Sequence, residues 1–163
     1  MRQVAPVIPA PDNGTRGQAA AGIQAIEREL DASPGAERLL ALAEEVLEIW
    51  ITARNDEPTH ETREGFRLLA LHHQGTRGVP SFNACRETCR EAAWHYNLLT
   101  LEPEHPESAQ RLRMMEMVVR HLALFVGGKL EVEGLGDFCC ASRPLRQDQS
   151  SMTNNLENGD RNA

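Results

Sequence analysis

Aromatic side chains are scarce in this sequence: Phe, Trp and Tyr make up 4% of the 163 residues, whereas apolar residues of all kinds make up 40%. The core of the fold therefore has to be built mainly from Leu, Val, Ile, Ala and Met. Long apolar runs are also missing, because no segment approaches the roughly 18 apolar residues that a membrane helix needs. The opening stretch, MRQVAPVIPAPDNG, has no apolar run of signal-peptide length. We therefore expect a cytoplasmic protein with no membrane-spanning segment.

Recognisable catalytic and nucleotide-binding motifs are absent as well. The sequence contains no G-x-S-x-G, no phosphate-binding loop and no G-x-G-x-x-G. Cysteine is limited to four residues, and a chain without an export signal keeps its thiols reduced by default. These absences favour a protein that is not an enzyme.

Apolar residues recur with the period of an α-helix through most of the chain. The clearest case is AERLLALAEEVLEIWITA, residues 36–53, which has large apolar side chains on one face and glutamates on the other. Ser33 is the predicted N-cap of this helix, with Pro34 at its first position. Further helices are predicted at about 18–31, 59–73, 81–101 and 106–126, and Gly127 and Gly128 are expected to close the last of them.

The two ends of the chain hold few large apolar residues. Residues 1–16 carry several prolines and residues 146–163 are almost wholly polar, so neither end can bury enough surface to offset its ordering entropy. We predict disordered tails at 1–16 and 146–163 around a single domain, residues 17–145. The fold class predicted for that domain is all-α, a bundle of four to five helices.

A short strand or hairpin is predicted at the C-terminal end of the domain. Leu130 and Val132 alternate with polar residues there, and Gly134 and Gly136 supply turn positions. We expect this element to lie against the bundle.

Charge is unevenly distributed along the chain, whose formal net charge is −7. Residues 20–64 hold eleven acidic and four basic residues, whereas residues 65–129 hold six acidic and eight basic ones. Contacts to nucleic-acid phosphates need clustered Lys or Arg, so an acidic chain disfavours a nucleic-acid partner. The acidic first half fits a protein partner, although solvated helix faces produce the same counts.

The stretch CRETCREAAWHYN, residues 85–97, concentrates the chemically reactive side chains. On a helix Cys85, Cys89 and Tyr96 share the inward face. Cβ atoms four residues apart lie about 5–6 Å from each other, but a disulfide needs about 3.5–4.5 Å, so a bridge between the two cysteines would be strained. Packing is the simplest role for buried thiols, and no cofactor is then expected. The alternative is a metal or redox site, with zinc or an iron–sulfur cluster held by Cys85, Cys89, Cys139 and Cys140.

The same helix has a second apolar face. Trp94, Leu98 and Leu101 fall together on the side opposite the cysteines. A helix that is apolar on two sides is either central in its fold or docks onto another protein. An exposed patch centred on a tryptophan is typical of binding hot spots.

A helix-turn-helix is a further possibility for residues 66–94. The turn G-V-P-S precedes a helix bearing Arg86 and Arg90, as in a DNA-reading helix. The loop is longer than usual for that motif, and Glu87 and Glu91 share the outward arc with the arginines. Arg–Glu pairing on a solvated face explains the pattern without DNA.

These observations predict a small regulatory or adaptor protein that binds another protein or a second copy of itself. The apolar anchors of the contact would be on the fourth helix, and the glutamates of residues 36–53 would steer the partner electrostatically. The predicted partner-binding residues are Trp94, Leu98, Leu101, Glu44, Glu45 and Glu48. A thiol-based metal or redox sensor and a DNA-binding regulator are the alternatives.

Overall fold

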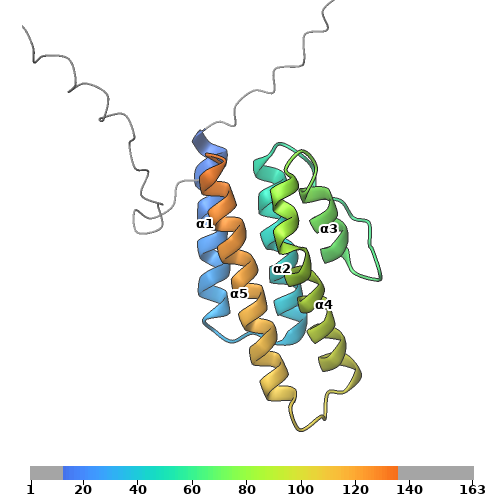
Figure 1. Cartoon of the computed structure of the whole chain (residues 1–163). Helices are drawn as coiled ribbons and strands as arrows, with labels where there is room; N and C mark the ends of the chain where they lie inside the picture. Colours follow the sequence, from blue (N-terminus) through green and yellow to red (C-terminus); the bar gives the residue numbers. More distant parts are fainter. Residues whose placement is uncertain (1–12, 136–163) are drawn as a thin grey trace, which may run out of the picture.

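The fold is an all-α bundle, as the helical periodicity predicts. A computed structural model describes residues 13–135, and the account below is confined to them. Figure 1 shows the helices side by side, with α5 alongside α1, α2 and α4, and with the short α3 beside α4. None of the helices in this range is long and apolar enough to cross a membrane. The elements, in chain order, are α1 (Asn13–Leu30), α2 (Ala36–Ala53), α3 (Arg67–Gly75), the 3₁₀ helix η1 (Pro80–Cys85), α4 (Arg86–Leu101) and α5 (Ser108–Val132).

The beginnings of four helices differ from the prediction. Helix α1 starts at Asn13, inside the range predicted as a tail. Ser33 does not cap α2, because its backbone is left-handed with a φ of 52° and Gly35 holds the N-cap position instead. Helix α3 starts only at Arg67, and a 3₁₀ turn containing Ser81 precedes α4, whose own N-cap is Cys85.

Helix α5 also ends later than predicted, because Gly127 and Gly128 lie inside it. The glycine that ends it is Gly134, which has a φ of 68°. The Leu135 N–H donates to the Leu130 carbonyl at 2.7 Å and the Gly134 N–H donates to the Glu131 carbonyl at 3.0 Å. This pair of bonds is the Schellman pattern, in which glycine is favoured because no Cβ opposes the positive φ.

Part of the predicted C-terminal strand is therefore helical. Leu130 and Val132, whose alternation predicted a strand, belong to the last turn of α5. Leu130 is fully buried in the core, which explains why it continues the helical stripe. The rest of the predicted strand or hairpin lies outside the described residues.

Helix α2 is the centre of the bundle, since it contacts each of the other four α-helices. Its Trp50 is fully buried and stacks on Phe82 of η1, with ring centroids 4.6 Å apart and planes inclined by 7°. The indole Nε1–H donates to the carbonyl of Gly75 at 2.9 Å. One side chain of α2 thus holds both the end of α3 and the 3₁₀ turn that leads into α4.

Gly75 lies so close to these two rings that a larger residue would not fit. A Cβ atom at this position would be 2.9 Å from Phe82 Cε1 and 3.1 Å from Trp50 Cδ1. Aromatic rings in a packed core cannot move aside without disturbing their other neighbours. The contact therefore requires glycine for space rather than for backbone conformation.

We predict that Gly75→Ala lowers the free energy of unfolding by about 1–3 kcal/mol, the usual effect of overpacking a core. Chemical denaturation followed by circular dichroism measures the change. The matched control is Gly17→Ala in α1, where nothing lies within 4 Å of the added Cβ. That variant should gain about 0.5–1 kcal/mol from helix propensity. Equal effects of the two substitutions would contradict the close contact at Gly75.

Candidate functional site

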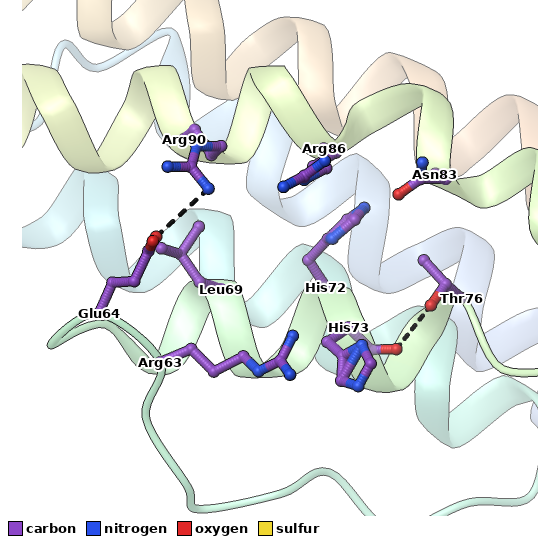
Figure 2. Close-up of a pocket in the computed structure, with 9 residues that line it drawn as sticks. All are labelled: Arg63, Glu64, Leu69, His72, His73, Thr76, Asn83, Arg86 and Arg90. Carbon is purple, nitrogen blue, oxygen red and sulfur yellow. Dashed lines mark hydrogen bonds and ion pairs between the residues drawn. The ribbon is translucent and has the colours of Figure 1, made fainter.

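A pocket of about 430 Å³ opens between α3 and α4 (Figure 2). Its walls come from three parts of the chain: α3 with the turn after it, the η1–α4 segment, and the turn before α3. In Figure 2 the arginines of α4 project toward α3, and His72 projects from α3 toward α4. We call this site the basic pocket. Its lining residues are Arg63, Glu64, Leu69, His72, His73, Thr76, Asn83, Arg86 and Arg90.

A tight turn holds one wall of the basic pocket in place. Arg63 and Phe66 exchange two backbone hydrogen bonds, of 3.0 and 2.9 Å. Glu64 and Gly65 between them have positive φ angles of 52° and 82°, as both central residues of a type I′ turn must. Phe66 then packs edge-on against Tyr96 of α4, with centroids 6.0 Å apart. The turn is thereby fastened to the helix across the pocket.

The basic pocket carries more positive than negative charge. Three arginines line it against a single carboxylate, Glu64, which pairs with Arg90 at 3.3 Å. Arg63 and Arg86 take part in none of the ion pairs that the structure describes. The pKa of His73 is lowered, first by burial and then by the positive charges of Arg63 and Arg77 and by His72. The electrostatic environment thus opposes adding another positive charge here.

His72 forms the inner wall of the basic pocket. Only 6% of its surface is exposed, and its ring stacks on Phe82 at a centroid distance of 6.1 Å. Its Nε2 is buried and has no hydrogen-bond partner among the described residues. A buried polar atom left unsatisfied costs about 1–3 kcal/mol in stability. An unpartnered buried polar atom calls for a specific explanation, such as a water or a ligand that it meets. His72 differs from His95, whose ring nitrogens also lack a hydrogen-bond partner among the described residues, in bordering the basic pocket.

Behind His72 lies the pair Cys85 and Cys89, both buried and both free thiols. The pKa of Cys85 is lowered to about 6, mainly because the Cys89 thiol hydrogen-bonds to it, with His72 adding to the effect against the opposing influence of burial. The pKa of Cys89 is raised, because it supplies that hydrogen bond and because it is buried. When Cys85 is protonated, its thiol donates to the Phe82 carbonyl at 3.2 Å, and that bond is given up on ionisation.

The predicted metal site is covered only in part by the structure. Cys85 and Cys89 lie together, as their spacing predicts, but Cys139 and Cys140 lie outside the described residues. Within residues 13–135 no three Cys, His, Asp or Glu side chains are grouped so that they could hold a metal ion. A zinc or iron–sulfur site would therefore need ligands from beyond this range.

The residues predicted to bind a partner are found in two different settings. Trp94 and Leu101 are exposed over 58% and 79% of their surface, while Leu98 is half-buried. The glutamates of α2 form ion pairs within the chain: Glu44 and Glu48 with Arg67, and Glu45 with Arg38 at 2.7 Å. Two arginines thus serve these three carboxylates, and Arg38 also pairs with Glu29, so the negative charge is reduced but not cancelled. The charge left to steer a partner is smaller than the sequence suggests.

Arg86 and Arg90, the residues that suggested a DNA-reading helix, both line the basic pocket. The sequence pointed to them through a motif, but it gave no reason to place them beside Arg63 and His72. Their position beside Arg63 and His72 depends on the turn at residues 63–66 and on how α3 packs against α4.

Comparisons with known proteins find no matching family model, no similar curated protein and no similar solved structure. The geometry of the chain alone therefore carries the functional argument.

We predict that the thiolate of Cys85 forms near pH 6, well below the ordinary thiol range around 9.0. The thiolate absorbance in the ultraviolet measures it in a chain with Cys139→Ser and Cys140→Ser, which leaves two thiols. Cys89→Ala removes the hydrogen-bond donor and should move the transition toward higher pH, whereas Cys85→Ala should abolish it. The pKa of Cys85 is about 6 in the folded chain and near 9.0 in the unfolded chain. The free energy of unfolding should therefore rise as the pH increases from about 6 to about 9, and this contribution should be absent below pH 6. An unchanged transition in Cys89→Ala would contradict the assignment.

Proposed function

We propose that this protein acts through helix-mediated contact with another protein chain, and not as a catalyst. The observation that supports this most directly is where its exposed apolar side chains lie. Each large apolar residue that is exposed in residues 13–135 belongs to α4 or α5, and α1, α2 and α3 contribute none. These two helices pack against each other. The residues are Trp94, Leu101, Met114, Met117, Leu124 and Val132.

Helix α5 has the pattern of a helix that pairs with another helix. Its solvent-facing residues Met114, Met117, His121, Leu124 and Gly128 follow one another at alternating intervals of three and four. We call this row the α5 seam. The same spacing defines the apolar seam of a coiled coil. Met117 and Leu124 are exposed over 63% and 60% of their surface, and the open space around Gly128 leaves room for a second helix to approach closely.

We propose a second copy of the chain as the partner of the α5 seam. The charges beside the seam support this choice. Arg113 and Glu131 take part in none of the described ion pairs, and they lie on the same side of the seam, toward its opposite ends. In an antiparallel pair of α5 helices, two-fold symmetry would place Arg113 of one copy beside Glu131 of the other. Two-fold dimers are also the commonest soluble assemblies.

The contact would extend onto α4. A specific interface buries about 800 Å² on each partner, which is more than one helical seam provides. Trp94 and Leu101 supply further apolar area on the neighbouring helix, and tryptophan is the residue most typical of binding hot spots. A regulatory or adaptor role in the cytoplasm is consistent with such a surface, and we propose it for this protein.

We predict that Met117→Glu with Leu124→Glu converts a dimer into a monomer, because four carboxylates would then meet across the two-fold axis. Sedimentation velocity over a range of concentrations measures the mass. The matched control, Ala21→Glu with Gln24→Glu, adds the same charge to exposed positions of α1 and should leave the dimer intact. Arg113→Glu should weaken the dimer, and Arg113→Glu combined with Glu131→Arg should restore it. A wild-type chain that stays monomeric throughout the range would refute the proposal.

Tryptophan fluorescence gives an independent measure of self-association. The chain has two tryptophans, and Trp50 is fully buried whether or not the chain associates. A blue shift with rising concentration would therefore report on Trp94 alone. Trp94→Ala should remove the shift and weaken association, and a shift that persists in this variant would argue against a contact on α4.

A thiol-based metal or redox sensor is a second candidate function. The observation that favours it is the lowered pKa of Cys85, because thiolates are the form that binds metals and reacts with oxidants. In this case Cys139 and Cys140 would join the buried pair. Elemental analysis and a visible spectrum of protein purified without oxygen should then show stoichiometric zinc or an iron–sulfur absorption, and Cys85→Ser should remove it. A folded, colourless and metal-free chain would eliminate the metal sensor.

A further inference from the structure

We propose that the basic pocket binds a small oxyanion, specifically the phosphate group of a low-molecular-weight ligand. The pocket is rich in arginine, small, and bordered by one buried histidine, His72. Phosphate binding there does not depend on the proposed dimer, because the pocket lies on the α3 side of α4 and the α5 seam lies on another helix.

The charge of the pocket runs against that of the whole molecule. The chain has a formal net charge of −7, yet this cavity brings Arg63, Arg86 and Arg90 together against Glu64 alone. Arg38, Arg67, Arg111 and Arg120 are each paired with a carboxylate. Arg63 and Arg86 are in none of the described ion pairs, and unlike the unpaired Arg28 and Arg113 they line a common cavity. An anion bound in the cavity would gain a favourable Coulomb interaction with these guanidinium groups.

Guanidinium and amide donors line the pocket on more than one wall. Arg86 and Arg90 are one helical turn apart on α4 and project toward α3 in Figure 2. Arg63 approaches from the turn on the opposite wall, and Asn83 lies at one end of the pocket. Guanidinium groups offer parallel N–H donors that match phosphate oxygens in pairs. Donors on different walls of a small cavity favour a compact anion over an extended one.

The shape of the pocket selects a small ligand. Its volume of about 430 Å³ is within the range of about 300–1,000 Å³ that is usual for small-molecule sites. Leu69 is its one large aliphatic lining residue, and no Phe, Tyr or Trp is among the lining residues on which a nucleobase would stack. A nucleic-acid backbone would need an extended basic surface, whereas the acidic charge of this chain repels a polyanion.

His72 joins the pocket to the thiol pair behind it. Its imidazole borders the cavity on one side and interacts with Cys85 on the other, and its Nε2 has no partner in the described structure. An anion in the pocket would place negative charge next to this ring and so change the electronic environment of its nuclei. Binding of an anion should therefore shift the imidazole NMR signals of His72, and this shift can be measured independently of the arginines.

Titration with inorganic phosphate, at constant ionic strength in chloride, tests the proposal by calorimetry and by the imidazole NMR signals of the full chain. The wild type should bind one phosphate, with a shift of the His72 signal assigned through His72→Gln. Arg86→Gln should raise Kd by about tenfold or more, the loss expected for a charge-assisted hydrogen bond. Arg86→Lys should bind with intermediate affinity, because it keeps the charge but loses the forked donor.

Arg28→Gln is the matched control, because Arg28 is exposed on α1 and takes part in none of the described ion pairs. It should bind phosphate as the wild type does, and circular dichroism should show that each variant is folded. Equal binding by Arg86→Gln and the wild type, or no saturable binding by the wild type, would overturn the proposal. Binding of duplex DNA that is lost in Arg86→Gln, without binding of phosphate, would also overturn it in favour of a DNA-reading helix.

Discussion

The contact among Trp50, Phe82 and Gly75 sets the positions of α3, η1 and the start of α4. Trp50 belongs to the central helix α2, and its ring and N–H hold η1 and the end of α3 together. Phe82 also contacts His72 and Phe125, so α5 is tied to the same cluster. Since α4 starts directly after η1, the position of Phe82 determines where the Cys85 thiol and the Arg86 guanidinium lie. The aromatic residues are few, but three of the chain's aromatic side chains meet in this one place.

Two surfaces result from this arrangement, and they differ in chemistry. The side of α4 that faces α3 contributes arginines to the basic pocket, while the outer faces of α4 and α5 present apolar side chains. Opposite properties on one helix are possible because its residues point in all directions around the axis. Arg38 and Arg67 pair with four glutamates and so offset part of the acidic charge of α1 and α2. The remaining acidic charge lies away from the lining of the pocket, where Glu64 is the one carboxylate.

Much of the bundle was predictable, because burial of one helical face leaves a period of 3.6 residues in the sequence. The ends of the helices were not. Ser33 has a capping side chain, but the chain direction needed to pack α1 against α2 places it in a left-handed turn instead. Gly127 and Gly128 look like a stop signal, yet burial of Val126, Gly127 and Leu130 carries α5 past them. Tertiary packing outweighs local propensity at such positions, since each propensity amounts to only about 1 kcal/mol.

The helical class, and the position of Trp94 on the side opposite Cys85 and Cys89, could be read from the sequence, because both follow from helical periodicity. Whether the Trp94 side is exposed or covered depended on the neighbouring helices. That Arg63, His72 and Arg86 surround one cavity was likewise settled by tertiary packing, since they come from three segments whose approach depends on the Trp50 cluster and on a two-residue turn. Tertiary packing also decided that Met117 and Leu124 face outward. Helix α5 is apolar on nearly every side, and only the placement of its neighbours determines which side remains uncovered.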